Sequence, residues 1–361
     1  MDSPRSNFLS ALEHFWNGWA SARKDILLIV CGSATSWIIN KVIKNHGGLH
    51  NRVSVRIHLK PFCLRECELY SEEMGLRFNR RQVLEGYMIM GGVPFYWSQL
   101  KPGMSLAQNI NQLFFSEDGS LRHEFDDLYD SLFKQPKPYL SIVDTLATKK
   151  VGMTRTEILQ ATKLTDNGKL TEYLENLEYC GFIRKYNCIG MKAKNALFQL
   201  MDNYTLFYYK FIKDSYINDA QYWTKITGKP EYNTWCGLAF ERVCLQHVEQ
   251  IKTKLGIQGV ITTVYSWSVA GSKDKPGAQI DLLIDRSDDV INLCEIKYSK
   301  APFQITNTID ASLQNKRERF IQETGTEKAV HLTMITTMGL SDNPYAWDVQ
   351  SVVTMDDLFV I

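Results

Sequence analysis

From residue 235 onward, the sequence predicts a fixed order of elements: a helix, three strands, a second helix and two further strands. Apolar residues at helical spacing predict helices over 237–254 and 309–323. Short apolar runs bounded by turn residues predict strands over 260–268, 278–285, 290–297, 329–337 and 349–354. This αβββαβ(β) order is compatible with several α/β folds. The side chains placed on it must therefore narrow the choice.

The strand predicted over 290–297 is apolar in its first half and ends in a charged pair, Glu295 and Lys297. Because side chains alternate along a strand, both project to the same face. The turn at 286–289 folds the preceding strand back, which brings Asp281 within about one residue of the position opposite Glu295. Glu241, on the predicted helix before these strands, can point to the same place. We therefore expect carboxylates and an ammonium to converge on a small patch.

Such a cluster has the chemistry that phosphodiester hydrolysis needs. Carboxylate oxygens hold Mg²⁺, and the ion binds the scissile phosphate and lowers the pKa of an attacking water. A lysine orients that water or offsets the charge that builds up in the transition state. The alternative is a surface ion pair at a strand end, which is common and contributes little energy.

With these residues on those elements, residues 235–361 resemble the PD-(D/E)xK restriction-endonuclease-like superfamily. The resemblance implies an αβββαβ endonuclease-like domain with metal-dependent phosphodiesterase chemistry. It further implies Asp281, Glu295, Lys297 and Glu241 as catalytic residues. The expected cofactor is Mg²⁺ or Mn²⁺, with Asp281 and Glu295 as its ligands.

Residues 137–202 have the pattern of a winged helix-turn-helix. Three predicted helices precede strands over 182–188 and 196–201, and residues 189–195 between the strands would form the wing. Residues 137–201 hold ten Lys and Arg against six Asp and Glu, which indicates either a DNA-binding surface or a solvated basic face. In a complex with DNA, phosphates would contact Lys169 on the third helix and Lys192 and Lys194 in the wing, with Arg184 and Lys185 near its base. Contacts with another protein would use the same surface.

The first third predicts a small part of an α/β unit. Residues 7–22 predict a helix, 25–31 a strand buried on both faces, 34–45 a helix and 52–57 a further strand. From 61 to 134 the pattern turns helical, with a break at 91–97. Residues 203–223 are rich in aromatic side chains, and their helical spacing favours packing between domains over stacking on bases.

Taken together, nearly the full length resembles the prokaryotic, archaeal-type AAA+ ATPases that carry a nuclease-like C-terminal domain. Residues 27–37 resemble the sensor-1 strand, and residues 51–62 resemble the segment that leads into the helical lid. Residues 91–96 resemble a GxP turn, and residues 202–212 match the aromatic segment before the nuclease-like domain. Nucleotide-associated roles are implied for Ser33 and Thr35 near the γ-phosphate, Arg52 as an arginine finger and Pro94 near adenine. Ser33 as a helix cap and Arg52 as a surface residue are the alternatives.

That resemblance divides the chain into five parts. They are a partial AAA+ core (1–60), a helical lid (61–136), a winged helix (137–202), an aromatic linker helix (203–234) and the nuclease-like domain (235–361). The sequence has no GxxxxGK(S/T) motif to cradle phosphates. We therefore expect an N-terminally truncated portion of such an ATPase, with ATP bound only in a full-length parent. The ATPase remnant also allows a homo-oligomer.

Two classes of function follow from these patterns. The first is a metal-dependent nuclease acting on DNA, and the second is a non-catalytic DNA-binding or regulatory switch protein with a degenerate nuclease fold. The eight cysteines are scattered without a CxxC pair, which is typical of reduced thiols in an intracellular protein. No run approaches 18 apolar residues, so we expect a cytoplasmic protein without a membrane span.

Overall fold

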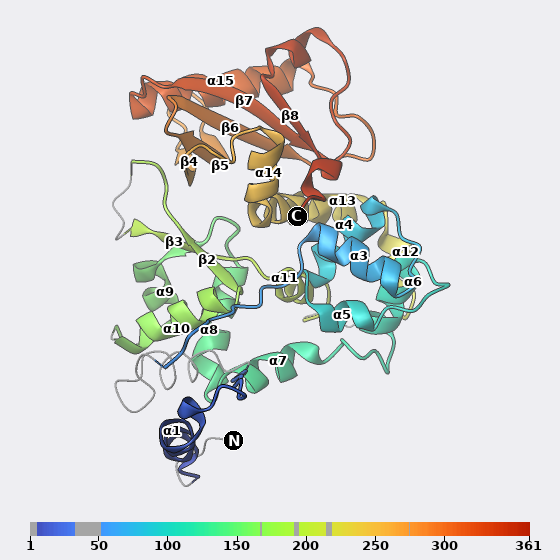
Figure 1. Cartoon of the computed structure of the whole chain (residues 1–361). Coiled ribbons are helices and arrows are strands. Elements are labelled where there is room, and N and C mark those ends of the chain that lie inside the picture. The colour runs from blue at the N-terminus through green and yellow to red at the C-terminus, as the bar shows by residue number, and fades with distance from the viewer. Residues whose placement is uncertain (1–5, 33–51, 167, 191–194, 214–218, 274) are drawn as a thin grey trace.

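The structure is a computed structural model that describes residues 6–32, 52–166, 168–190, 195–213, 219–273 and 275–361 (Figure 1). Helices dominate the first part of the chain, and two separate β-sheets follow. The protein is therefore an α/β protein of several parts, as expected. Within the described ranges, no helix is both long enough and apolar enough to cross a membrane.

The first sixty residues form few regular elements. The helix predicted over 7–22 is confirmed as α1 (Phe8–Gly18) followed by the 3-10 helix η1 (Ala20–Ala22). The strands predicted over 25–31 and 52–57 do not form, and the first is not buried: Leu27 is 84% exposed. A strand needs neighbours that bond its backbone and cover its side chains, and the described residues supply none here. The prediction of an α/β core in this segment is therefore wrong for the described residues, and the helix expected near 34–45 lies outside them.

Residues 61–136 fold as helices, as predicted. A capping box between Asn79 and Gln82 begins α4, and Gly91, with φ of 60°, ends it. A side chain at Gly92 would clash with the carbonyl oxygen of Phe62, so the break in the pattern is a tightly packed turn that requires glycine. The elements are α3 (Leu64–Glu73), α4 (Arg80–Met90), α5 (Pro94–Ser98), α6 (Leu106–Ile110), the π-helix η3 (Asn111–Phe115) and α7 (Glu124–Leu132).

Residues 136–201 form a compact group that we call the three-stranded unit. Its elements are α8 (Pro136–Ala147), β1 (Met153–Thr154), α9 (Arg155–Thr162), α10 (Gly168–Tyr179), β2 (Ile183–Tyr186) and β3 (Leu197–Leu200). The strands form an antiparallel sheet in the order β1-β3-β2. The predicted helices and strands are confirmed, including the capping box of Thr154 and Glu157 that begins α9.

The last part of the chain, here called the five-stranded unit, also has the predicted order. It comprises α13 (Pro230–Gln246), α14 (Val248–Lys254), β4 (Thr262–Val269), β5 (Ala278–Arg286), β6 (Val290–Lys297), α15 (Asn307–Thr324), β7 (Ala329–Thr336), the 3-10 helix η5 (Pro344–Asp348), β8 (Ser351–Thr354) and the 3-10 helix η6 (Met355–Leu358). The strands lie in sequence order, antiparallel from β4 to β6 and parallel from β6 to β8.

Helices cover both faces of this sheet (Figure 1). Leu283 and Leu293 belong to one buried cluster with Phe320 of α15. Leu282 and Cys294, the adjacent residues along β5 and β6, belong to a second cluster that includes α13. Alternation along the strands thus produces two cores, one on each face.

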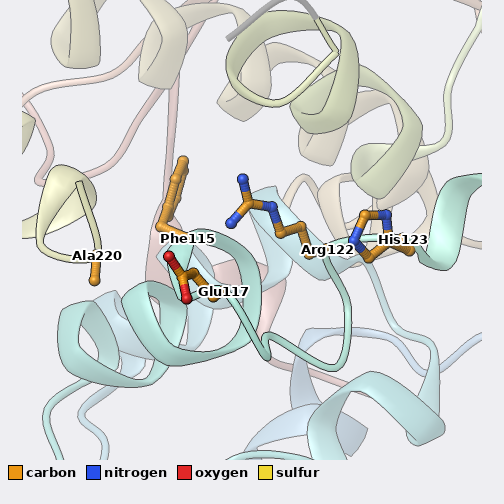
Figure 2. A pocket seen from close by; sticks show the side chains of 5 residues that line it. All are labelled: Phe115, Glu117, Arg122, His123 and Ala220. Carbon is orange, nitrogen blue, oxygen red and sulfur yellow. The ribbon is translucent and has the colours of Figure 1, made fainter. Parts of the chain in front are cut away.

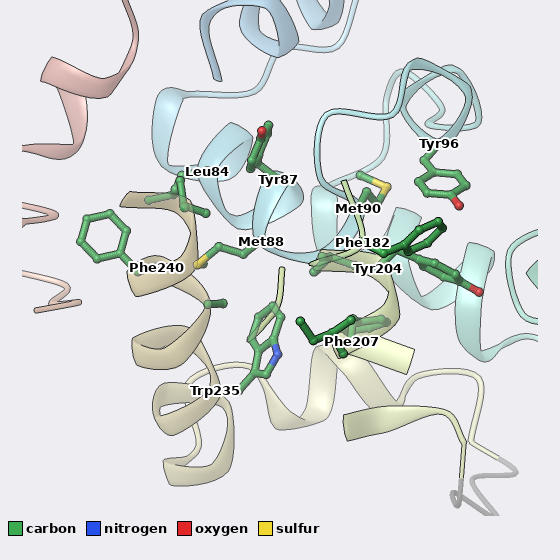
Figure 3. Close-up of a cluster of buried hydrophobic side chains, with 14 of the residues drawn as sticks. Leu84, Tyr87, Met88, Met90, Tyr96, Phe182, Tyr204, Phe207, Trp235 and Phe240 are labelled. Atoms are coloured by element: carbon green, nitrogen blue, oxygen red, sulfur yellow. The ribbon is translucent and has the colours of Figure 1, made fainter. Parts of the chain in front are cut away.

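An aromatic core joins the helices of residues 61–136, here called the helical segment, to the five-stranded unit (Figure 3). The linker helices are α11 (Asn203–Phe211) and α12 (Tyr222–Ile226). The ring of Phe207 is fully buried, with ring centroids 5.2 Å from Phe114, 5.2 Å from Trp223 and 5.8 Å from Trp235. The prediction that these rings pack between segments is confirmed.

A buried histidine makes a second link. The backbone N–H of Leu64 in α3 donates to Nε2 of His247 at 3.0 Å, so Nδ1 carries the proton and donates to the Val243 carbonyl at 2.8 Å. Burial lowers the pKa of His247 to about 4. The imidazole is therefore neutral at neutral pH and ties the helical segment to the five-stranded unit.

Candidate active site

Asp281 lies in a β-bulge of β5. Two residues of β5, Asp281 and Leu282, lie opposite the single residue Ser266 of β4. A bulge bends the strand and re-aims a side chain, and bulges are enriched beside functional sites. On the other side of β5, Leu282 pairs with Cys294, so Asp281 and Glu295 are the next positions along two neighbouring strands. The position predicted for Asp281 relative to Glu295 is therefore observed.

Glu295 is buried between two lysines. Its Oε1 lies 2.9 Å from Nζ of Lys297, and its Oε2 lies 2.7 Å from Nζ of Lys316 on α15. Burial raises the pKa of this carboxyl, but the ammonium groups of Lys316 and Lys297 outweigh it and hold the pKa of Glu295 below its ordinary value. The carboxylate is thus ionised and fully paired.

Glu241 and Asp281 share a third lysine, which comes from the three-stranded unit. Nζ of Lys150 lies 2.8 Å from Oε2 of Glu241 and 3.8 Å from Oδ2 of Asp281. Burial lowers the pKa of Lys150, but the negative charges of Asp281, Glu241 and Glu295 more than offset this and raise it. Burial and the charge of Asp281 raise the pKa of Glu241, while Lys150 opposes that rise. Two carboxylates from different elements therefore contact one cation, the ammonium of Lys150.

Two further polar side chains complete the surroundings. Nε2 of Gln279 donates to Oδ1 of Asp281 at 2.6 Å, which orients that carboxylate. The guanidinium of Arg184 stacks over the ring of Tyr186 at 4.3 Å and donates to Oε1 of Gln199 at 2.7 Å. Burial lowers the pKa of Arg184, against the charges of Asp281 and Glu241, among others. This arginine is held against Tyr186 and Gln199 of its own unit.

The donor set fits a divalent ion in its chemistry, because Glu241, Asp281 and Glu295 offer the hard oxygen ligands that Mg²⁺ and Mn²⁺ prefer. As they lie, lysines neutralise all three. Within the part of the chain that the structure describes, no group of three or more His, Cys, Asp or Glu is arranged to hold a metal ion. A divalent ion would therefore have to displace at least the ammonium of Lys150.

The other predicted site residues are not brought to this patch. Ser33, Thr35, Lys192 and Lys194 lie outside the described residues. Arg52 is exposed in a stretch without regular structure, and Pro94 is the first residue of α5 and exposed. Lys169 on α10 and Lys185 on β2 are exposed on the three-stranded unit.

Sequence reasoning missed Lys150, Lys316 and Gln279. Lys316 carried a signal: it falls at helical spacing with Leu313 and Phe320, on the buried face of α15, where a lysine needs a partner. Gln279 lies two residues before Asp281, on the same strand. Lys150 carried no signal, because its partners are far away along the chain and only the tertiary structure joins them.

A pocket lies away from this patch, between the helices of residues 61–136 and the linker that contains Ala220. Its volume is about 460 Å³, and Phe115, Glu117, Arg122, His123 and Ala220 line it (Figure 2). None of the carboxylates described above borders it, so it belongs to a different part of the surface.

No family model matches the chain. Among curated proteins, it is 25% identical over 228 residues to "Uncharacterized protein MJECL04" of Methanocaldococcus jannaschii. This match covers 62% of the chain and 50% of that protein, so the chain spans about half the length of the curated relative it matches. Among solved structures, the "Crystal structure of protein VC1899 from Vibrio cholerae" is matched at 11% identity, over 83% of this chain and 59% of that one, with a TM-score of 0.24. A TM-score this low does not establish a shared fold.

Proposed function

We propose that the chain is a metal-dependent phosphodiesterase of the nuclease type that acts on DNA, with its active site at Glu241, Asp281, Glu295 and Lys297. One observation carries the proposal: carboxylates from α13 and β5, Glu241 and Asp281, contact a single cation, Lys150, and Glu295 is the next position beside Asp281 on the neighbouring strand β6. Like charges gathered this closely repel one another unless a cation lies between them. A cluster of this kind therefore requires a cation, and in this proposal a divalent ion takes that place.

The residues have separate roles in this proposal. Asp281 and Glu295 would hold the divalent ion, with Glu241 as a further ligand or support, and the ion when bound lowers the pKa of a water and polarises the phosphate. Gln279 keeps the Asp281 carboxylate oriented through its 2.6 Å hydrogen bond. Lys297, half-exposed beside Glu295, donates to the attacking water or to a phosphate oxygen and offsets the charge of the transition state.

DNA as the substrate is supported by the three-stranded unit. Its helices and strands have the order expected of a winged helix, and Lys169 and Lys185 are exposed on it. Residues 137–201 also carry more basic than acidic side chains. Descent from an AAA+ ATPase rests on the sequence segments given above, and the described residues add no nucleotide site to it. We propose that this chain alone does not hydrolyse ATP.

A specific observation favours a second candidate, a non-catalytic DNA-binding or regulatory protein with a degenerate nuclease fold. Each of the three carboxylates already has a lysine partner: Lys150 for Glu241 and Asp281, and Lys297 and Lys316 for Glu295. A protein that had lost its metal could keep its acidic residues in this way, as structural ion pairs.

Cleavage of single- and double-stranded DNA, with and without Mg²⁺ or Mn²⁺, separates the two candidates. The wild-type protein should cleave only with metal, and Asp281→Asn and Lys297→Ala should each reduce the rate at least about 100-fold. Asp285→Asn is the matched control, because Asp285 lies on the same strand but pairs with Lys328 at 2.7 Å. DNA binding without any cleavage in either metal would favour the second candidate instead.

A further inference from the structure

We propose that Lys150 is a built-in counter-cation that closes the candidate active site, so that a divalent ion and the docked three-stranded unit compete for Glu241 and Asp281. This inference concerns regulation and rests on the function proposed above. It predicts that the described arrangement is a closed one. Loading the site with metal then requires Lys150 to withdraw.

The geometry of the ammonium supports this assignment. Nζ of Lys150 lies 2.8 Å from Oε2 of Glu241 on α13 and 3.8 Å from Oδ2 of Asp281 on β5, two of the carboxylates that would hold the metal ion. A lysine donates hydrogen bonds and cannot ligate a metal while it is protonated. Lys150 and a divalent ion therefore exclude each other from this position.

The backbone around Lys150 is held firmly by the sheet of the three-stranded unit. Nε2 of Gln199 donates to the Lys150 carbonyl at 2.6 Å, and the Tyr186 hydroxyl donates to the Val151 carbonyl. Gly152 has φ of 87°, and a side chain there would clash with the carbonyl oxygen of Phe198, so the turn depends on glycine. Lys150 therefore projects from a fixed turn, and the docked unit holds its ammonium within reach of Glu241 and Asp281.

A second contact docks the same unit on the same edge of the sheet. Ser266 of the edge strand β4, which lies opposite the bulge in β5, pairs outward with the segment 187–189 that follows β2. The backbone N–H of Ile189 donates to the Ser266 carbonyl at 3.1 Å, and the Ser266 N–H donates to the Asn187 carbonyl at 3.4 Å. The three-stranded unit is thus docked on β4 directly opposite the bulge that contains Asp281, so its position bears on the site.

The neighbouring lysine shows that the arrangement is specific. Lys149 turns to Glu157 within its own unit, with Nζ 3.1 Å from Oε1, and does not contact the carboxylates. The side chains of Lys149 and Lys150 are 50% and 42% exposed, and those of their partners Glu157 and Glu241 are 41% and 13% exposed. Replacing either should leave the fold intact, which makes Lys149→Ala a matched control.

Calorimetric titration of Mn²⁺ into the full chain tests the inference. Lys150→Ala should bind Mn²⁺ at least about five-fold more tightly than the wild-type protein, whereas Lys149→Ala should match the wild type. Lys150→Met, which keeps the length of the side chain without its charge, should also bind more tightly. If Lys150→Ala does not fold, the Mn²⁺ affinity of Lys150→Met tests the proposal in its place.

The possible failures are distinguishable through Asp281→Asn. Equal or weaker Mn²⁺ binding by both Lys150 variants, with wild-type binding that Asp281→Asn abolishes, would overturn the closure by Lys150 and leave the proposed function standing. If the wild-type protein and the Lys150 variants show no Mn²⁺ binding that depends on Asp281, the proposed function fails and the closure fails with it.

Discussion

Two apolar runs of similar composition differ in this protein, because one is exposed and the other is buried in a sheet. Residues 25–31 predict a strand buried on both faces, and residues 290–297 predict a strand that is apolar in its first half. The first run lies exposed and without regular structure, whereas the second is β6, at the centre of the five-stranded sheet. Leu27 is 84% exposed, and Leu293 is fully buried. The two differ in their neighbours, since β5 and β7 flank β6 and no described strand flanks the first run. Burial of an apolar run is a property of its surroundings as much as of its sequence.

The largest expected effect comes from truncating one leucine in each run. Leu293→Ala should lower the free energy of unfolding by about 2–5 kcal/mol, because it leaves a cavity in the core beneath α15. Leu27→Ala should change it by no more than about 0.5 kcal/mol. Urea unfolding followed by tryptophan fluorescence measures both. A cost for Leu27→Ala close to that of Leu293→Ala would mean that residues 26–31 are buried after all.

Acid should weaken the link between α3 and the five-stranded unit. The pKa of His247 is lowered from an ordinary value of 6.5 to about 4 in the folded protein. Between these pH values the histidine is protonated in the unfolded chain and neutral in the folded one. Stability should be unaffected by this group above about pH 7 and should fall by about 3 kcal/mol as the pH drops through this window.

The difference in stability between the wild-type protein and His247→Gln, measured from pH 8 to about pH 4, isolates this contribution. An exposed histidine, His123, offers the control substitution. If the difference between the wild-type protein and His247→Gln is constant across the window, the buried neutral imidazole is not what the structure indicates.

How far the sequence predicts the structure follows from the same comparison. The helices of both units, the strands β2 to β8 and the placement of Asp281 beside Glu295 were predictable, because alternation, capping residues and a short turn are local signals. The exposure of residues 26–31 was not, because it depends on neighbours that a local pattern cannot report. Lys150 was unpredictable for the same reason, since it reaches Glu241 and Asp281 only through the docking of one unit on another.

A smaller effect is expected on the surface of the three-stranded unit. Replacing Lys169 and Lys185 by glutamine should weaken DNA binding and lower the slope of log affinity against log salt by about 0.9 for each phosphate that the protein no longer neutralises. Lys225→Gln serves as the control, because its ammonium pairs with Asp219, near the start of α12, at 2.8 Å. An unchanged slope in the double variant would indicate that this surface binds a protein partner.

The smallest effect is expected with nucleotide. The sequence has no P-loop, and the described part of the first sixty residues forms no sheet to support one. Calorimetric titration with ATP and Mg²⁺ should therefore give no measurable heat of binding. A micromolar dissociation constant would show that the first sixty residues form an ordered nucleotide site. They would then not differ from the five-stranded unit in the way described above.

Thermal unfolding with and without Mn²⁺, in the wild-type protein and in Asp281→Asn, tests most directly whether the carboxylates form a divalent-cation site. Binding to the folded state alone stabilises it by about 2.7 kcal/mol when the ion is present at about 100 times its dissociation constant. The wild-type melting temperature should therefore rise with Mn²⁺. That of Asp281→Asn should not, and its metal-free stability should lie within about 1 kcal/mol of the wild type. Wild-type melting curves that overlay with and without Mn²⁺ would contradict the assignment of a metal site to these residues.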